Sequence, residues 1–248
     1  MKQLLSIIAC IVLLQWPSIT SAHQVRVVGE HLIPFQGVVD GNIEGLAIDL
    51  TRALIEQTRV DASFEIYPWA RAYSDAQRFP NVLLLSVSRT PERENKFKWI
   101  GQVVKSKVTY WRLKNRHDIT GPLNPTKLSH LAIGVQRDAV YHEYLKKHLP
   151  NTENLALTTT NAQAIKMLYA GRIDIMMSNE VTFKQRAVEL GLDPNQLEKV
   201  NTETNLYSTL YLAFSKQTPD ELVNLFKNTY KALDDEQVID EIRQHWLP

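Results

Sequence analysis

The chain has 248 residues, of which 44% are hydrophobic and 22% are charged, an ordinary globular composition. This length is compatible with one large domain or with two lobes of about 100 residues each. The 28 basic and 27 acidic residues nearly cancel, which argues against a dedicated binder of nucleic acid or of an anionic membrane surface.

The first 22 residues have the pattern of a secretory signal peptide. Lys2 supplies a positive charge, an apolar stretch runs from Leu4 to Leu14, and residues 20–22 (Thr-Ser-Ala) form a small-residue cleavage site. The apolar stretch is too short to span a bilayer stably, and no later stretch approaches that length. We therefore expect a protein that is exported to the periplasm, cleaved near Ala22 and soluble there.

The only cysteine, Cys10, lies inside this leader. Residues 7–10 (Ile-Ile-Ala-Cys) also resemble a lipoprotein box, but the apolar stretch continues beyond the cysteine, which favours an ordinary leader residue. A mature chain without cysteine has no disulfide, thiolate nucleophile or cysteine-based metal site. The seven histidines include no HExxH pair, so we predict no metal and no cofactor.

Strand and helix patterns alternate in the first part of the mature chain. The expected elements are a β-branched strand at 25–28, a helix at 44–58, a strand at 62–68, a helix opened by Pro68 and an apolar strand at 82–88. Pro91 then starts a short helix with Thr90 as its N-cap. This β-α alternation predicts a mostly parallel sheet.

A second α/β run follows a strand at 108–116 and a turn-rich segment. Its expected elements are strands at 131–135, 155–159 and 172–178, and helices at 139–149, 161–171 and 180–191. Gly171 and Gly191 stand where glycine ends a helix. The chain closes with a strand at 208–215, a helix with Thr218 as N-cap and Pro219 as its first residue, and a short amphipathic helix through Trp246.

Strand-like segments on both sides of the second run predict two lobes joined by crossing strands. The expected division is a signal peptide (1–22), the first part of lobe one (23–108), an inserted lobe two (109–208), and a return to lobe one with the C-terminal helices (209–248). Ligands of such sheets gather at the C-terminal ends of the strands, between the lobes.

Several motifs in this order resemble the family 3 solute-binding proteins of polar amino-acid ABC transporters. They are IPF at 33–35, GLAIDL at 45–50, SVSRTPER at 86–93 ahead of FKWIG, IGV at 133–135, AGRIDIMMSNEV at 170–181 and LAFSK at 212–216. The resemblance implies the α/β, two-lobed type II periplasmic binding fold with two crossing hinge strands. It also implies capture of a small carboxylate-bearing ligand by hinge closure, without enzymatic activity, and delivery to an inner-membrane permease by a monomer.

In this family the segment that matches SVSRTPER holds the carboxylate of the ligand. The resemblance makes Ser88 and Arg93 carboxylate donors and places Ser86 beside them. The chemistry agrees, because a carboxylate is bound well by a bidentate guanidinium, short hydroxyl donors and a helix N-terminus. The alternative is that the serines only end a strand and that both arginines are solvated, which is the reading we favour for Arg89.

Two further positions of the resemblance are apolar. Trp69 matches the residue that packs against the ligand, although Trp69, Ala72, Tyr73 and Ala76 equally form a helical core stripe. Leu32 stands at the position of an aromatic platform, which weakens stacking on the ligand there.

The sequence departs from the family pattern around two polar positions. Asn179 replaces the aspartate that pairs with the ligand ammonium, so an ordinary α-amino acid is in doubt unless Glu180 supplies the charge. Arg137 and Asp138 replace a small glycine-containing turn, and Arg137 fits a role in the cleft. These departures favour a dicarboxylate or another small organic anion.

Two other functions stay open at this point. The same lobes serve as a periplasmic sensor input that passes closure to a membrane partner. They also occur in small-acid dehydratases, for which Glu180 or Asp138 would be the acid-base group.

Overall fold

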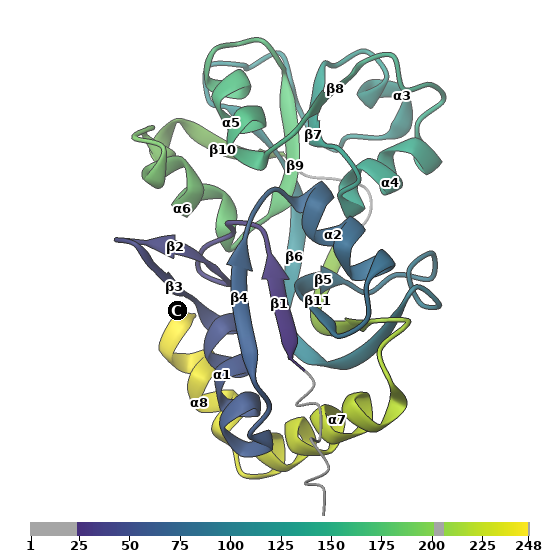
Figure 1. Ribbon diagram of the computed structural model, residues 1–248. Helices are drawn as coiled ribbons and strands as arrows, with labels where there is room; N and C mark the ends of the chain where they lie inside the picture. The colour runs from purple at the N-terminus through teal and green to yellow at the C-terminus, as the bar shows by residue number, and fades with distance from the viewer. Residues whose placement is uncertain (1–23, 201–205, 248) are drawn as a thin grey trace, which may run out of the picture.

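The computed structural model describes residues 24–200 and 206–247, so the expected signal peptide and Cys10 lie outside the described part. The chain forms a mixed α/β fold with two halves, one below and one above a waist in Figure 1. One sheet runs through both halves in the order β4-β1-β5-β11-β6-β9-β7-β8, with β10 paired to β6. Within the described ranges, no helix is long and apolar enough to cross a membrane.

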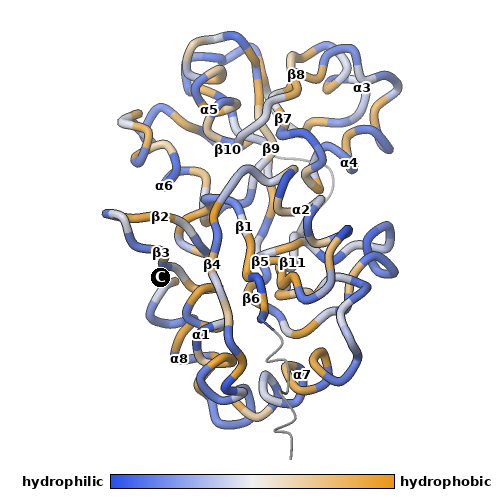
Figure 2. Tube along the Cα trace, viewed as in Figure 1, coloured by the Kyte–Doolittle hydropathy of each residue, from blue (hydrophilic) through white to orange (hydrophobic). Residues whose placement is uncertain are grey.

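The lower half contains three parallel strands with helices on both faces. Its strands are β1 (Val25–Gly29), β4 (Ala62–Ile66) and β5 (Val82–Ser88), its hairpin is β2 (Gly37–Val39) and β3 (Asn42–Glu44), and its helices are α1 (Leu46–Thr58), α2 (Trp69–Arg78), α7 (Asp220–Asp235) and α8 (Val238–Trp246). Every residue of β5 is buried, as the unbroken apolar run predicts. Figure 2 shows hydrophobic residues along the central strands and polar residues on the outer loops.

The upper half repeats this arrangement on a smaller scale. Its elements are α3 (Pro125–Leu128), β7 (Ile133–Gln136), α4 (Val140–His148), β8 (Leu155–Thr158), α5 (Asn161–Tyr169), β9 (Ile175–Asn179), α6 (Thr182–Glu189), the 3₁₀ turn η1 (Pro194–Gln196) and β10 (Leu197–Val200). β7 pairs in parallel with both β8 and β9. The sheet therefore contains two groups of parallel strands, one in each half, whose C-terminal ends face one another across the waist (Figure 1).

Two antiparallel strands connect the halves, as expected. β6 (Phe97–Leu113) runs upward and β11 (Leu206–Ser215) returns beside it. Val108 is the residue at which β6 changes partners, because it pairs with β11 and with the last residue of β9. The lobe boundaries at 108/109 and 208/209 fall within these strands and stay a prediction.

Three local expectations differ from the structure. Residues 91–96 form successive turns and not a helix. Thr218 is not the N-cap of α7: its hydroxyl bonds Ser215 and accepts from the Asn81 amide, and Pro219 takes the cap position. Likewise, Pro68 is the N-cap residue of α2, and Trp69 is the first residue of the helix. Both starts differ from the expected position by one residue, which is the usual uncertainty of a helix end.

The two glycine stops are confirmed. Gly171 and Gly191 follow the ends of α5 and α6 with φ of 66° and 70°, the left-handed region that only glycine enters at little cost. The Gly171 amide donates to Leu168 and the next amide donates to Met167, which satisfies carbonyls at the end of α5.

Gly101 allows the C-terminal helices to dock on β6. A Cβ atom at this position would lie 2.2 Å from the Tyr230 ring of α7. The Tyr230 hydroxyl donates to the Gln102 carbonyl at 2.7 Å, so the ring cannot move without loss of this bond. We expect Gly101→Ala to lower the free energy of unfolding by about 2 kcal/mol, measured by urea denaturation. The same change in a Tyr230→Ala background should cost much less, and an equal cost there would contradict the steric explanation.

Candidate functional site

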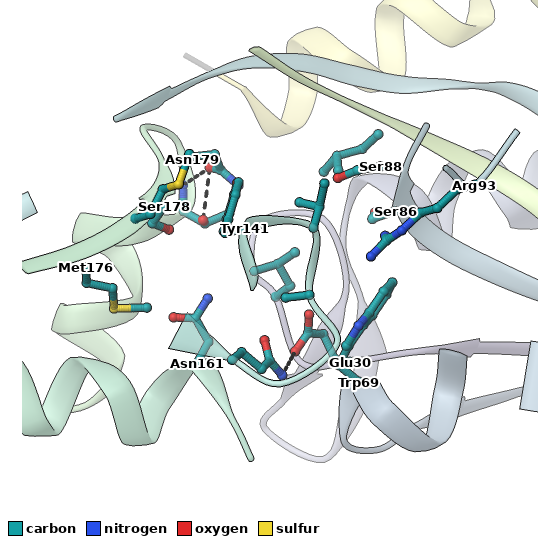
Figure 3. Close-up of a pocket in the computed structure, with 17 residues that line it drawn as sticks. Glu30, Trp69, Ser86, Ser88, Arg93, Tyr141, Asn161, Met176, Ser178 and Asn179 are labelled. Atoms are coloured by element: carbon teal, nitrogen blue, oxygen red, sulfur yellow. Dashed lines mark hydrogen bonds between the residues drawn. The ribbon is translucent and has the colours of Figure 1, made fainter. Parts of the chain in front are cut away.

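A small cavity of about 60 Å³ lies between the two halves, at the strand ends (Figure 3). The lower half contributes Glu30, Leu32, Trp69, Ser86, Ser88 and Arg93, and the polar residues of the upper half are Gln136, Tyr141, Asn161, Ser178, Asn179 and Thr182. The helices α2, α4, α5 and α6 all begin at this cavity. Their N-termini add partial positive charge, which favours an anionic group.

Ser86 and Ser88 lie at the end of β5, where the strand bulges. Ser86 has a φ of 48°, rare for a residue other than glycine, and the pairing with β11 slips by one residue beside it. The Ser86 hydroxyl donates to the Gln36 side chain at 2.6 Å. The Ser88 and Ser208 hydroxyls share a hydrogen bond of 2.7 Å. The bulge therefore turns both serines toward the cavity while each keeps a protein partner.

Arg93 is buried, with only 1% of its surface exposed, and its guanidinium end points into the cavity (Figure 3). Its Nε donates to Glu143 Oε2 at 3.1 Å, and its NH2 group lies 3.0 Å from Glu143 Oε1 and 3.1 Å from the Asp138 carbonyl oxygen. Trp69 and Tyr73 lie against the guanidinium, 5.7 and 4.9 Å from its carbon atom to the ring centroids. The arginine that sequence analysis singled out thus lies in the cavity and already contacts the opposite half.

The apolar candidates also line the cavity. Trp69 is buried, packs on Tyr73 and donates its indole N–H to the Asp138 carbonyl at 2.9 Å, so it has both the core and the cavity roles that its position allows. Leu32 lies at the cavity wall. Arg89 is outside it: this arginine pairs with Glu94 and lies against the Trp99 and Tyr211 rings.

Asn179 lines the cavity, but its side-chain oxygen is occupied. Oδ1 accepts from both the amide and the hydroxyl of Thr182, each at 2.9 Å, which anchors the start of α6. The remaining NH₂ group can only donate, and Tyr141 lines the same cavity. The replacement of aspartate therefore changes this position from an acceptor into a donor. Burial raises the pKa of Tyr141, which keeps its phenol neutral.

The structure corrects the predictions for the two neighbouring acidic and basic candidates. The Arg137 and Asp138 side chains are exposed and do not line the cavity. The reason is the left-handed backbone of Asp138, with a φ of 59°, and a turn that directs its carbonyl group, not its side chain, toward Trp69 and Arg93. Glu180 also lies outside the cavity, where its carboxylate pairs with Lys199 at 2.6 Å.

Sequence analysis missed Glu30, the one carboxyl among the described residues that line the cavity. Glu30 directly follows β1, and Gln136 donates to its Oε2 at 2.8 Å from the end of β7. Burial raises the pKa of Glu30 to about 7, while the bond from Gln136 and the charges of Arg186 and His31 oppose the rise. The rule that ligands gather at strand ends would have identified this residue.

A second cavity of about 320 Å³ adjoins the first at Glu30 and Asn161. Tyr67, Ile66 and Arg186 are among its other walls, and His31 borders it while bonding Glu189 of α6 at 3.2 Å. The Asn161 side-chain oxygen is buried and has no hydrogen-bond partner among the described residues. The junction therefore offers two acceptor groups, the Glu30 carboxyl and the Asn161 oxygen.

The described residues, 24–200 and 206–247, contain no cluster of side chains that could bind a metal ion. No group of three or more histidine, aspartate or glutamate side chains there could hold a metal ion. His142 and His148 fall on the same helix, but the His148 ring stacks on Tyr144 and hydrogen-bonds its own helix. The site consists of hydroxyl, amide and charged groups for an organic ligand.

Solved structures similar to this one include binding proteins and a sensor domain. They include a histidine kinase sensor domain with similarity to periplasmic binding proteins (TM-score 0.78, 22% identity, 92% of this chain and 97% of that chain covered). Another is the arginine-, lysine-, histidine-binding protein ArtJ of Geobacillus stearothermophilus (0.75, 19%, 90% and 95%). A third is the amino acid ABC transporter substrate-binding protein AbpA of Streptococcus pneumoniae, bound to L-arginine (0.75, 21%, 92% and 95%).

These likenesses confirm the type II periplasmic binding fold that the sequence predicts. No curated protein sequence matches the chain. The model of the bacterial extracellular solute-binding proteins, family 3, matches residues 25–248, nearly the whole chain. The protein therefore belongs to the family 3 bacterial extracellular solute-binding proteins.

Proposed function

We propose that this protein is a periplasmic binding protein that captures a small carboxylate-bearing ligand by closure of its two halves and delivers it to an inner-membrane permease. The observation that carries the proposal is the buried Arg93 at a cavity where four helices begin. Family membership supports solute binding. The Ser88 hydroxyl and the Asn179 NH₂ group add neutral donors around the same cavity.

The other end of the ligand is assigned to Glu30 and Asn161. Both present acceptor oxygens where the two cavities meet, so they suit an ammonium, a guanidinium or another group rich in N–H donors. One of the similar proteins is named for binding arginine, lysine and histidine, and the structure of another contains L-arginine. We infer a ligand of the amino-acid class whose cationic group lies at Glu30 and whose carboxylate lies at Arg93.

A thermal-shift screen of amino acids and organic acids tests this function. A ligand at 100 times its Kd stabilises the folded state by about 2.7 kcal/mol, which is readily detected. Native mass spectrometry of the freshly purified protein adds an independent test, because a tightly bound ligand remains on the protein. If no carboxylate-bearing compound in either experiment binds, the proposed ligand class is wrong.

Changing Asn179 to aspartate is expected to improve the binding of α-amino acids by about tenfold, because a carboxylate oxygen would replace the NH₂ group that faces the cavity. The other oxygen can keep the two bonds from Thr182, so the start of α6 should be preserved. Isothermal titration calorimetry with an amino acid and its 2-hydroxy analogue measures the effect. Equal gains for both compounds would show that the new charge does not contact the amino group.

A sensor function is the second candidate, because a sensor domain of a histidine kinase covers almost the same length at a TM-score of 0.78. The ligand chemistry would be the same, and only the partner would differ. Pull-down of membrane proteins by the ligand-saturated protein discriminates the two, since a permease and a kinase are readily told apart.

An enzyme on this fold is the remaining alternative. Glu30, not Glu180 or Asp138, would be the acid-base group, because it alone of the three lines the cavity and because its pKa is raised to about 7. Product formation from a bound ligand, lost in Glu30→Gln, would favour the enzyme. An unchanged ligand recovered after prolonged incubation favours a binding protein.

A further inference from the structure

The guanidinium assigned to the ligand carboxylate is shared with a carboxylate of the protein itself. Glu143, on α4 of the upper half, contacts Arg93 with both oxygens, at 3.1 Å to Nε and 3.0 Å to NH2. The two residues come from opposite halves and are 50 positions apart in the chain. The hydrogen bonds and the ion pair of Arg93 with the described residues use Nε and NH2, and none of them uses NH1. Glu143 therefore occupies the edge of the guanidinium formed by Nε and NH2, and NH1 remains for a ligand.

Neighbouring contacts hold α4 against the same turn. Lys147 lies one helical turn after Glu143 and pairs with Glu92 at 3.0 Å, next to Arg93 in the sequence. At the start of α4, the Asp138 carbonyl accepts from both Arg93 and Trp69. The contact between Glu143 and Arg93 is thus part of a built interface between the two halves and not an isolated surface pair.

The burial of Arg93 gives this pair a consequence for closure. A guanidinium at 1% exposure needs a counter-charge, since an unpaired buried charge is strongly unfavourable. A binding site without Glu143 would receive that charge only from the carboxylate of a ligand. Here Glu143, whose side chain is 32% exposed, supplies it when the halves come together. Closure therefore does not depend on a ligand charge.

The pair also sets the charge that a ligand meets. Arg93 and Glu143 neutralise one another, and among the other described lining residues Glu30 is the one carboxyl while the phenol of Tyr141 stays neutral. A ligand with one carboxylate and one cationic group matches this arrangement. A second ligand carboxylate would meet Glu143 on one side or Glu30 on the other, with no further cation in the lining to accept it.

We propose that Glu143 is a selectivity residue of this site: it occupies one edge of the Arg93 guanidinium, admits one ligand carboxylate, disfavours dicarboxylates and lets the halves close without a ligand. This inference rests on the proposed function, because it assumes that a ligand carboxylate binds at Arg93. It reverses the preference for dicarboxylates that the sequence suggested.

The test compares Glu143→Gln with Glu92→Gln, a matched control that removes the same charge from the same interface but leaves Arg93 paired. Calorimetry measures the Kd of monocarboxylate ligands (L-arginine, L-lysine, L-glutamine) and of dicarboxylates (L-glutamate, L-aspartate, succinate). Small-angle X-ray scattering measures the radius of gyration of each ligand-free protein. Neither glutamate is fully buried, so both variants should fold.

We expect Glu143→Gln to improve the affinity for dicarboxylates by about tenfold or more relative to monocarboxylates, and to enlarge the ligand-free protein through opening of the cleft. Glu92→Gln should do neither. Equal changes in both ligand series, or no change, together with unaltered scattering, would overturn the proposal while leaving the proposed function intact. If no carboxylate binds either the wild type or Glu143→Gln, the proposed function and the selectivity role fall together.

Discussion

Arg93→Met is expected to weaken the binding of every carboxylate-bearing ligand by about 100-fold or more. The guanidinium is buried, lies at the cavity and offers charge-assisted hydrogen bonds, and truncating such a charge typically costs about 2–5 kcal/mol, where each 1.4 kcal/mol is tenfold. Methionine preserves much of the packing against Trp69 and Tyr73, whose rings lie beside the guanidinium. Calorimetry with the best ligand of the screen measures the loss.

Two further variants separate charge from geometry. Arg89→Met is the matched control: it removes an arginine four residues away that pairs with Glu94 outside the cavity, and we expect less than about a twofold effect. Arg93→Lys keeps the charge but not the planar fork, so it should recover only part of the affinity. If Arg93→Met binds as tightly as Arg89→Met, the carboxylate does not lie at Arg93.

Much of the lower half follows from local patterns. The unbroken apolar run of β5 predicts a strand buried on both faces, and the residues that follow such a strand lie at the edge where ligands gather. These two rules place the segment 86–93 at the edge of the cavity, and the family resemblance singled out Arg93 within it. The same rules apply to Glu30, which follows β1 and also lines the cavity. No neighbouring motif distinguishes this glutamate from an exposed one, so the sequence did not single it out.

The remaining features depend on contacts between distant residues. The pairing of Arg93 with Glu143 joins the two halves, and its geometry comes from the docking of α4 and not from either local sequence. The left-handed backbone of Ser86 comes from the bulge in its pairing with β11, at a residue with no intrinsic preference for it. Arg137 is exposed outside the cavity lining, beside the left-handed backbone of Asp138, a conformation that the local sequence does not indicate either.

The effect of having asparagine in place of aspartate at position 179 was only partly predictable from the sequence. Loss of the aspartate charge was evident from the sequence. The two bonds that bind Oδ1 to Thr182 were not, and they turn a weakened acceptor into a donor. The cationic end of the ligand must then be recognised elsewhere in the cavity, which gives Glu30 its importance.

Glu30 is expected to make stability and ligand affinity respond to pH in opposite directions. Burial raises its pKa from 4.5 to about 7, so the folded protein holds a proton there that the unfolded chain releases. The stability that this proton confers is fully present below pH 4.5 and is lost as the pH rises through about 7. The ligand-free wild type should therefore become less stable between pH 5 and pH 8, by an amount on the order of 2 kcal/mol. Glu30→Gln should show a flatter profile.

Binding of a cationic ligand group should have the reverse dependence. The deprotonated carboxylate attracts the cation, so affinity is expected to rise with pH through about 7, with release of a proton on binding. Glu30→Gln should bind such a ligand about tenfold more weakly at pH 8 and nearly as well as the wild type at pH 5.5. Calorimetry in buffers of different ionisation enthalpy measures both the affinity and the proton count.

The other groups near Glu30 define the control. Arg186 and His31 act on Glu30 through their charges, Gln136 donates to it, and the neutral phenol of Tyr141 lies at the same cavity. Of these, an imidazole could impose its own dependence on pH, so His31→Gln is measured beside Glu30→Gln. If His31→Gln abolishes the pH dependence and Glu30→Gln does not, the cation does not bind at Glu30. Retention of the rise in His31→Gln and its loss in Glu30→Gln assigns the cationic end of the ligand to this carboxylate, opposite the guanidinium that holds its acid group.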